Sequence, residues 1–124
     1  MIKLGRHLSI GGGIDKAVDE TIEIGANSLQ IFTKSPRSWK KKTIEQTEIK
    51  QTKEKLEKHE IKGFVVHSSY LVNLASPKDD LYKKSKEEIK EDYYQAGLLN
   101  ADYYVFHPGN YVKSSKEEGI KKII

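Results

Sequence analysis

The sequence predicts an α/β fold made of four βα units whose strands run parallel. Short runs rich in β-branched and aromatic residues recur four times, and longer polar segments with helical spacing separate them. Strands joined by helical crossovers run in the same direction, because each crossover returns the chain to the end from which it left. Two architectures accept this order. An open doubly wound sheet can be complete with four strands, whereas a (β/α)8 barrel needs about twice as many units.

The first two helices are predicted from their start signals and apolar faces. We place strands at residues 2–4, 28–32, 63–66 and 103–106. After the first strand, Gly12-Gly13 precede a helical stripe, and Gly25 stands where a C-terminal cap belongs. The stripe consists of Ile14, Ala17, Val18, Thr21 and Ile22. A second helix is expected from Thr43, capped with the help of Gln46, to about His59. Its thin apolar face, typical of a surface helix, is Ile44, Ile49 and Leu56.

The last two helices begin at serines. Ser76 is suited to be an N-cap, and Pro77 fits the first helical position, where a missing N–H costs nothing. The stripe expected to be buried in this helix is Tyr82, Ile89, Tyr93, Ala96 and Leu99. Ser115 with Glu118 marks a fourth start. The apolar face that follows, at Ile120, Ile123 and Ile124, is cut off by the chain end, so we expect the sequence to stop inside a helix.

The composition predicts a single soluble domain. Hydrophobic residues make up 36% of the 124 residues and charged residues 32%, which argues against a disordered or membrane chain. No apolar run approaches the roughly 20 residues that span a bilayer. Glycines rather than an apolar segment follow Lys3 and Arg6, so we expect no signal peptide and a cytoplasmic location. Because cysteine is absent, any metal must be held by His, Asp or Glu.

Histidines follow three of the four predicted strands, at His7, His67 and His107. The carboxyl ends of parallel strands meet at one edge of a sheet, where functional groups gather in both candidate architectures. His67 and His107 follow neighbouring strands, which lie about 4.8 Å apart, so two imidazoles can share one cation. Nitrogen and carboxylate ligands without thiolates suit a catalytic zinc or manganese. A single histidine in such a place is more often structural, and His59 near a helix end needs no function.

One stretch is strongly basic. Residues 34–42 hold five basic side chains and Trp39 with no acid among them, whereas elsewhere Lys alternates with Glu. The net charge of +4 is compatible with a polyanionic partner, although Lys-rich solvated helices give the same value. The stretch therefore predicts either a phosphate-binding loop or a solvated turn. The glycine run at residues 11–13 is likewise either a helix entry or a phosphate cradle.

Four segments together resemble the endonuclease IV family. They are GRHLS at 5–9 with Gly12-Gly13, FTKSPRSW at 32–39, HSSYLVNL at 67–74 and FHPG at 106–109. They stand in family order and at family spacing over essentially the whole chain. The resemblance implies a (β/α)8 barrel with three zinc ions at its carboxyl face. It also implies hydrolysis of the DNA phosphodiester 5′ to an abasic site, leaving a 3′-hydroxyl.

The resemblance assigns roles to individual residues. His67 and His107 resemble the two imidazole ligands of one zinc, which the family completes with a Glu from a later strand. Arg37 resembles the family residue that enters the DNA at the damaged position. Tyr70 and Leu71 resemble the family residues that insert into the distorted duplex. Inserted side chains of this kind offset stacking lost at the site. Double-stranded DNA with abasic sites is the implied partner.

Three further residues join the expected DNA-binding group, namely His7, Lys34 and Trp39. His7 matches a family histidine near the DNA face, and we assign it to phosphate or to support of the metal ligands. Arg6 departs from the family pattern, because a small residue usually stands there. No catalytic residue beyond the metal ligands is expected in this chain.

The family's remaining ligands come from strands five to eight, which this chain lacks. We therefore expect residues 1–124 to form the N-terminal half of a barrel and to be inactive by themselves. We expect this half either to need a second chain that carries the other half or to associate with itself. Two alternatives stay open: a metal-dependent sugar isomerase or epimerase-like barrel, and a non-catalytic DNA-binding α/β domain. The loops around Arg37 and Tyr70 argue against the sugar alternative, because they have no obvious role in binding a small sugar.

Overall fold

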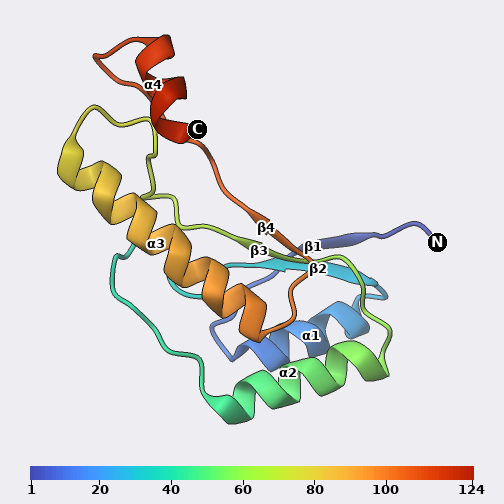
Figure 1. Ribbon diagram of the computed structural model, residues 1–124. Helices are drawn as coiled ribbons and strands as arrows, with labels where there is room; N and C mark the ends of the chain where they lie inside the picture. Colours follow the sequence, from blue (N-terminus) through green and yellow to red (C-terminus); the bar gives the residue numbers. More distant parts are fainter.

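The computed structural model describes residues 1–124 and contains one four-stranded parallel sheet (Figure 1). Its strands are β1 (Gly5–His7), β2 (Ser28–Ile31), β3 (Phe64–His67) and β4 (Tyr103–Val105). The order across the sheet follows the order in the chain, and each neighbouring pair is parallel. The helices are α1 (Ile14–Glu23), α2 (Gln46–Lys58), α3 (Asp79–Leu98) and α4 (Lys116–Ile123). No helix is both long and apolar enough to cross a membrane.

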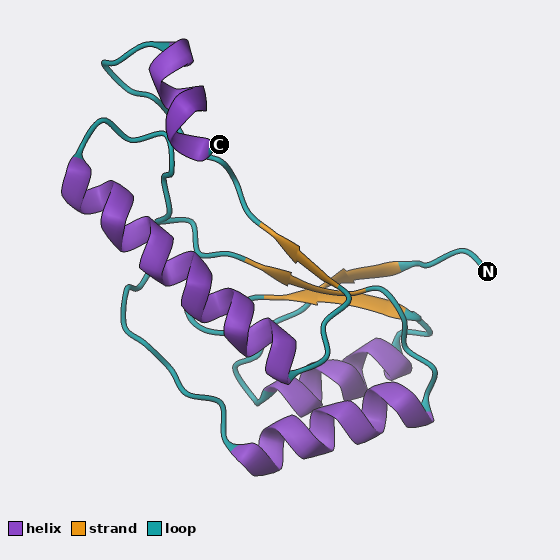
Figure 2. Ribbon diagram, viewed as in Figure 1, coloured by secondary structure: helices purple, strands orange, loops and turns teal.

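The crossover helices distinguish the two predicted architectures. Figure 2 shows α1, α2 and α3 on one side of the sheet, while the other face carries no helix. A doubly wound sheet has helices on both faces. The fold is therefore half of a TIM barrel, with four βα units, and the bare face corresponds to the barrel interior. Residues of β4 on that face, Tyr103 and Val105, are 55% and 42% exposed.

The hydrophobic core lies between the sheet and its helices. Strand residues that point toward the helices are almost completely buried, because side chains alternate between the two faces of a strand. They pack against the apolar stripes of α1 and α2, so that this side of the half-barrel is closed. The central residues are Leu29, Ile31, Phe64, Val66, Ile14, Val18 and Leu99, each no more than 1% exposed.

The first strand does not lie where the apolar residues predicted it. The prediction was 2–4, whereas the ladder with β2 pairs Gly5 with Ser28 and His7 with Gln30. Leu4 is 72% exposed, and its N–H donates to the side-chain oxygen of Asn27 at 2.8 Å instead of to a ladder carbonyl. The apolar residues indicated that a strand lies near the N-terminus, but hydrogen bonding with β2 determines which residues form it.

Two predicted helix starts were also displaced. The second helix begins at Gln46 rather than Thr43, with Glu45 as N-cap and no side-chain cap. The third begins at Asp79, because Ser76 accepts a hydrogen bond from the N–H of Lys78 and closes a turn before the helix. The fourth start is confirmed, since the hydroxyl of Ser115 accepts from the N–H of Glu118.

The buried face of α3 is mostly polar, which corrects the predicted stripe. Tyr93 is 67% exposed, and Tyr82 and Ile89 are only partly buried. Ala96 and Leu99 are buried as predicted. The other buried positions on this face are Ser85, Glu88, Asp92 and Gln95. This helix therefore meets the sheet through hydrogen-bonding groups as well as apolar ones.

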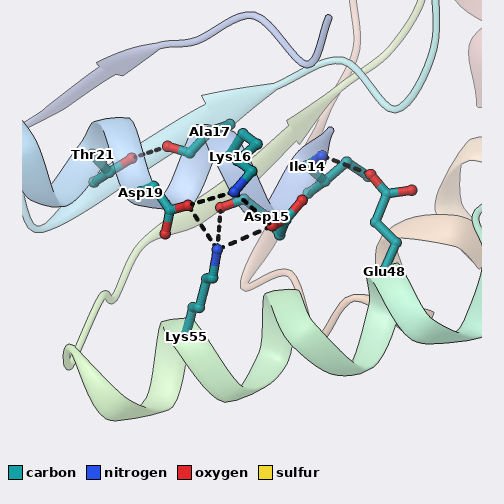
Figure 3. A network of polar contacts seen from close by, with 8 residues as sticks. All are labelled: Ile14, Asp15, Lys16, Ala17, Asp19, Thr21, Glu48 and Lys55. Atoms are coloured by element: carbon teal, nitrogen blue, oxygen red, sulfur yellow. Dashed lines mark hydrogen bonds and ion pairs between the residues drawn. The ribbon is translucent and has the colours of Figure 1, made fainter. Parts of the chain in front are cut away.

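An ionic contact joins α1 to α2 on the far side of the core (Figure 3). The ammonium of Lys55 lies 3.0 Å from a carboxylate oxygen of Asp15 and 2.7 Å from one of Asp19. The carboxylate of Glu48 accepts a hydrogen bond of 2.7 Å from the N–H of Ile14, the first residue of α1. A side chain of the protein thus occupies the start of this helix, which supports the glycine run as a helix entry rather than a phosphate cradle.

Candidate metal and DNA site

The imidazoles of His67 and His107 meet at the carboxyl edge of the sheet. His67 ends β3 and His107 follows β4, the neighbouring strand. Their ring centroids lie 5.0 Å apart, with an angle of 48° between the ring planes. Two imidazoles bound to one tetrahedral zinc at about 2.0 Å hold their centroids about 5 Å apart. The separation therefore fits two ligands of a single zinc ion.

A hydrogen bond leaves one nitrogen of His67 free for such a role. The Nδ1 atom lies 2.8 Å from the backbone carbonyl oxygen of Ser68. Because a carbonyl only accepts, Nδ1 carries the proton in the neutral ring, and the lone pair of Nε2 remains available. Metal-binding histidines in general use their second ring nitrogen in this way, which fixes the ring orientation.

His7 lies beside this pair, with an aromatic ring between. The ring of Phe32 is 4.4 Å from that of His7 and 5.5 Å from that of His67. The side-chain amide of Gln30 lies 2.8 Å from Nδ1 of His7. Partial burial lowers the pKa of His7, and the nearby His67 lowers it further. With Nδ1 accepting from Gln30, the neutral ring presents an Nε2–H donor, which suits a phosphate oxygen.

The chain brings only two candidate metal ligands together. No group of three or more His, Cys, Asp or Glu side chains in residues 1–124 is arranged to hold a metal ion. Catalytic zinc sites commonly have three protein ligands and a water. His67 and His107 fit part of such a site, and His7 stands beside it rather than within it.

The loops after β2 and β3 are joined beneath the exposed side chains of Arg37 and Tyr70. The carbonyl of Pro36 accepts from the N–H of Tyr70 at 2.9 Å and from the hydroxyl of Ser69 at 2.8 Å. The ring of Tyr70 is 58% exposed and contacts Phe32 edge-on, 5.1 Å away. The two side chains predicted to enter DNA are thus held on one rim, next to the histidines.

Two members of the predicted DNA-binding group have partners within the protein. Lys34 is only 7% exposed and forms an ion pair with Glu88 of α3. Its ammonium is therefore paired within the protein, and its predicted contact with DNA stays a prediction. Trp39 is partly buried, and the ammonium of Lys84 lies over its ring at 4.7 Å. Leu71 is partly buried beside Tyr70.

The rest of the basic segment remains at the surface. The side chains of residues 40–42 are exposed, next to a groove between the loops after β1 and β2. This groove has a volume of about 540 Å³ and is lined by His7, Ser9, Ser35 and Lys42, among others. Hydroxyl and ammonium donors together with His7 in this groove suit an anionic ligand.

Three residues beneath the site were missed by the sequence reasoning: Asn73, Glu88 and Asp92. The polar stripe of α3 was visible in the sequence, since Ser85, Glu88, Asp92 and Gln95 recur at helical spacing. Charged residues are rarely buried, so this spacing by itself favours a solvated face. Asn73 gave a weaker signal, because an Asn in a loop commonly bonds only to its own turn.

A parallel half-barrel with polar side chains gathered at the carboxyl edge of its sheet belongs to the class of TIM-barrel proteins. Comparison with known proteins agrees. Residues 18–124 match a family described as the xylose isomerase-like TIM barrel. The crystal structure of endonuclease IV from Thermus thermophilus superposes with a TM-score of 0.85 at 35% identity. The match covers 98% of this chain and 46% of that one.

Proteins described as probable endonuclease 4 match along nearly the whole chain. The one from Halothermothrix orenii is 46% identical over 123 residues, and the one from Thermotoga maritima is 40% identical over 126. The chain belongs to the xylose isomerase-like TIM barrel family, where it corresponds to the N-terminal half of endonuclease IV. It spans 44% of the length of these two relatives.

Proposed function

We propose that this chain carries the N-terminal part of a zinc-dependent endonuclease for abasic DNA. The reaction would be hydrolysis of the phosphodiester 5′ to the abasic site, leaving a 3′-hydroxyl. The observation that carries the proposal is the 5.0 Å separation of the His67 and His107 rings, beside a rim that displays Arg37 and Tyr70. The names and similarity of the endonuclease IV relatives support it.

His67 and His107 would hold one zinc ion through their Nε2 atoms, with later strands of the complete protein supplying the other ligands. When bound, zinc lowers the pKa of a coordinated water and neutralises charge on a phosphate. The chain's own contribution is geometric. The bond from Nδ1 of His67 to Ser68 orients that ring, and the Nε2–H of His7, whose Nδ1 is paired with Gln30, would donate to a phosphate oxygen.

The rim would distort the duplex. Arg37 and Tyr70 project from two loops that are tied through Pro36, so they would enter the DNA as one rigid element. Opening the stack costs least where a base is already missing, which favours abasic sites. Lys40, Lys41 and Lys42 would attract the backbone, so binding should weaken as salt rises. Such a role would be performed in the cytoplasm, with DNA and the remainder of the barrel as partners.

A chimera tests the proposal. This chain is fused to the part of the Halothermothrix orenii relative that follows its matched region, and cleavage of an abasic duplex is measured with zinc present. We expect specific cleavage 5′ to the abasic site, and no cleavage above background by the 124-residue chain alone. Replacing His67 or His107 by Ala should abolish cleavage by the chimera.

The histidine outside the site serves as the matched control. His59 lies at the C-terminal end of α2, so His59→Ala in the chimera should leave cleavage unchanged. If the chimera cleaves equally well with both His67 and His107 replaced, the proposed role of the pair is wrong. Turnover of a sugar by the chimera, without abasic cleavage, would favour the isomerase-like alternative.

A further inference from the structure

Asn73 bridges the two loops that carry the histidine pair. Its side-chain oxygen accepts from the N–H of Asn110 at 2.9 Å, and its side-chain nitrogen donates to the carbonyl of Asn110 at 2.9 Å. The same oxygen accepts from the N–H of Ala75 at 3.1 Å. One side chain therefore satisfies both backbone groups of a residue 37 positions away, in the manner of a β-ladder pair.

The bridge is fixed from both sides. Behind it, the N–H of Asn73 donates to the hydroxyl of Ser85, a fully buried residue of α3, at 2.8 Å. Beside it, the N–H of Leu74 donates to the carbonyl of Pro108 at 3.1 Å. Gly109 has a φ of +107°, and a Cβ at this position would collide with the amide of Asn73. Gly109 thus lets the loop approach the bridge.

The two joined loops are those that follow His67 and β4, and they contain Tyr70 and His107. His67 is the last residue of β3, whereas His107 lies two residues beyond the end of β4, and His107 and its loop are exposed. The ladder between β3 and β4 ends with the pairing of His67 and Val105, two residues before His107. Past this point, the two loops are linked by the side-chain bridge of Asn73 and by the single backbone hydrogen bond from Leu74 to Pro108.

We propose that Asn73 is a positioning residue that holds His107 at the distance from His67 at which both rings bind one zinc ion. This role rests on the proposed zinc site. It requires no contact between Asn73 and the metal, because the side chain acts through the backbone of residues 108–110. Residues that orient metal ligands in this indirect way typically contribute about 10- to 100-fold in metal affinity.

Asn27 provides a matched control at the other end of the sheet. Its side-chain oxygen accepts from the N–H of Leu4 at 2.8 Å, and its nitrogen donates to the carbonyl of Ile2 at 3.0 Å. It therefore makes the same kind of bridge to a distant backbone segment, but before β1 rather than after β4. Loss of its side chain removes similar hydrogen bonds without touching the loops of the histidines.

The experiment measures zinc affinity of the 124-residue protein by competition with a chromophoric chelator, together with its urea unfolding midpoint. Asn73→Ala should weaken zinc binding by about 10-fold or more. Asn27→Ala should lower the unfolding midpoint comparably and leave zinc affinity unchanged. If the two variants lose affinity equally, or if Asn73→Ala binds zinc as the unaltered protein does, the positioning role is overturned.

A glycine pair repeats the test without removing an amide. Gly109→Ala and Gly25→Ala both place a side chain in a left-handed conformation, since Gly25 has a φ of +71°. Only at Gly109 does the new methyl group meet Asn73, because nothing lies within 4 Å of the site at Gly25. Gly109→Ala should weaken zinc binding and Gly25→Ala should not. Equal affinities for these two variants would also contradict the proposal.

The variants also distinguish failure of the proposed zinc site from failure of the proposed role of Asn73. If the unaltered protein binds one zinc that His67→Ala abolishes, the zinc site stands whatever the asparagine variants do. If zinc binding does not depend on His67 and His107, the proposed site is wrong, and the positioning role falls with it.

Discussion

Two lysines form ion pairs between elements of the half-barrel, and they differ in how far their side chains are exposed to water. Lys55 joins α2 to Asp15 and Asp19 of α1, and its side chain is 27% exposed. Lys34 begins the loop after β2 and pairs with Glu88 of α3, where both side chains are no more than 7% exposed. The first contact fastens two helices far from the histidines. The second fastens a loop that carries Arg37 to a helix beneath the site.

The difference indicates that the buried contact serves geometry more than stability. Removing a lysine and a carboxylate from water costs several kcal/mol per ion, which their attraction repays only in good geometry. Asp92, one turn from Glu88 on the same helix, accepts a 3.1 Å hydrogen bond from the hydroxyl of Thr33. Burial raises the pKa of Asp92, and the negative charge of Glu88 raises it further. The inner face of α3 thus holds the start of the β2 loop by polar contacts.

The largest effect is expected where the buried pair is broken. Glu88→Ala leaves the ammonium of Lys34 buried without its partner, which should lower the free energy of unfolding by about 3–5 kcal/mol. Urea unfolding followed by circular dichroism measures this. Replacing both members, with Lys34→Met and Glu88→Leu, should recover most of the loss. A loss below about 1 kcal/mol for Glu88→Ala would mean that the pair is solvated.

A smaller effect with a defined sign is expected at Asp92. Its raised pKa means that the folded protein holds the proton more tightly than the unfolded chain does. The resulting stability is complete below the ordinary carboxyl value of 3.8 and is lost as pH rises through the raised value. The slope is at most about 1.4 kcal/mol per pH unit for one proton.

Asp92→Asn should remove this decline, because the amide keeps an oxygen that accepts from Thr33 and never ionises. The measurement is the free energy of unfolding as a function of pH above 3.8 for both proteins. Parallel curves for the variant and the unaltered protein would show that Asp92 ionises as it does in water.

The smallest effect is expected at the surface contact. Lys55→Met should lower the free energy of unfolding by on the order of 1 kcal/mol, less than Glu88→Ala does, because an ion pair that water partly reaches gains little. The loss should shrink further at high salt, where screening weakens the pair. Comparison of the two proteins in low and high salt checks this. A cost equal to that of Glu88→Ala would remove the distinction between the two lysines.

Element order and strand ends could be predicted well from the sequence, since these follow from local periodicity. Ser115 capped its helix as predicted, and three strands lie within one or two residues of their expected bounds. The first strand was placed too early because Ile2 and Leu4 are apolar but 85% and 72% exposed. Their position depends on which residues pair with β2, and periodicity in a single segment does not contain that information.

The proximity of the two histidine rings could be predicted, because the spacing of neighbouring strands decides it. His67 and His107 meet because adjacent parallel strands deliver their ends to one edge. Burial could not be predicted where a distant partner decides it. Lys34 looked like its exposed neighbours in the basic segment, but Glu88 lies 54 positions further along the chain and buries it. Asn73 was missed for the same reason, because its partner is Asn110.

The most direct test of a shared zinc site follows the histidine rings during a zinc titration. Nuclear magnetic resonance of the 124-residue protein with 15N-labelled histidine resolves the four imidazoles of the chain. We predict that the signals of His67 and His107 shift together and saturate at one zinc per chain, with no comparable change at His59. Shifts of His67 and His107 at different zinc concentrations, or of only one of them, would contradict a shared metal site.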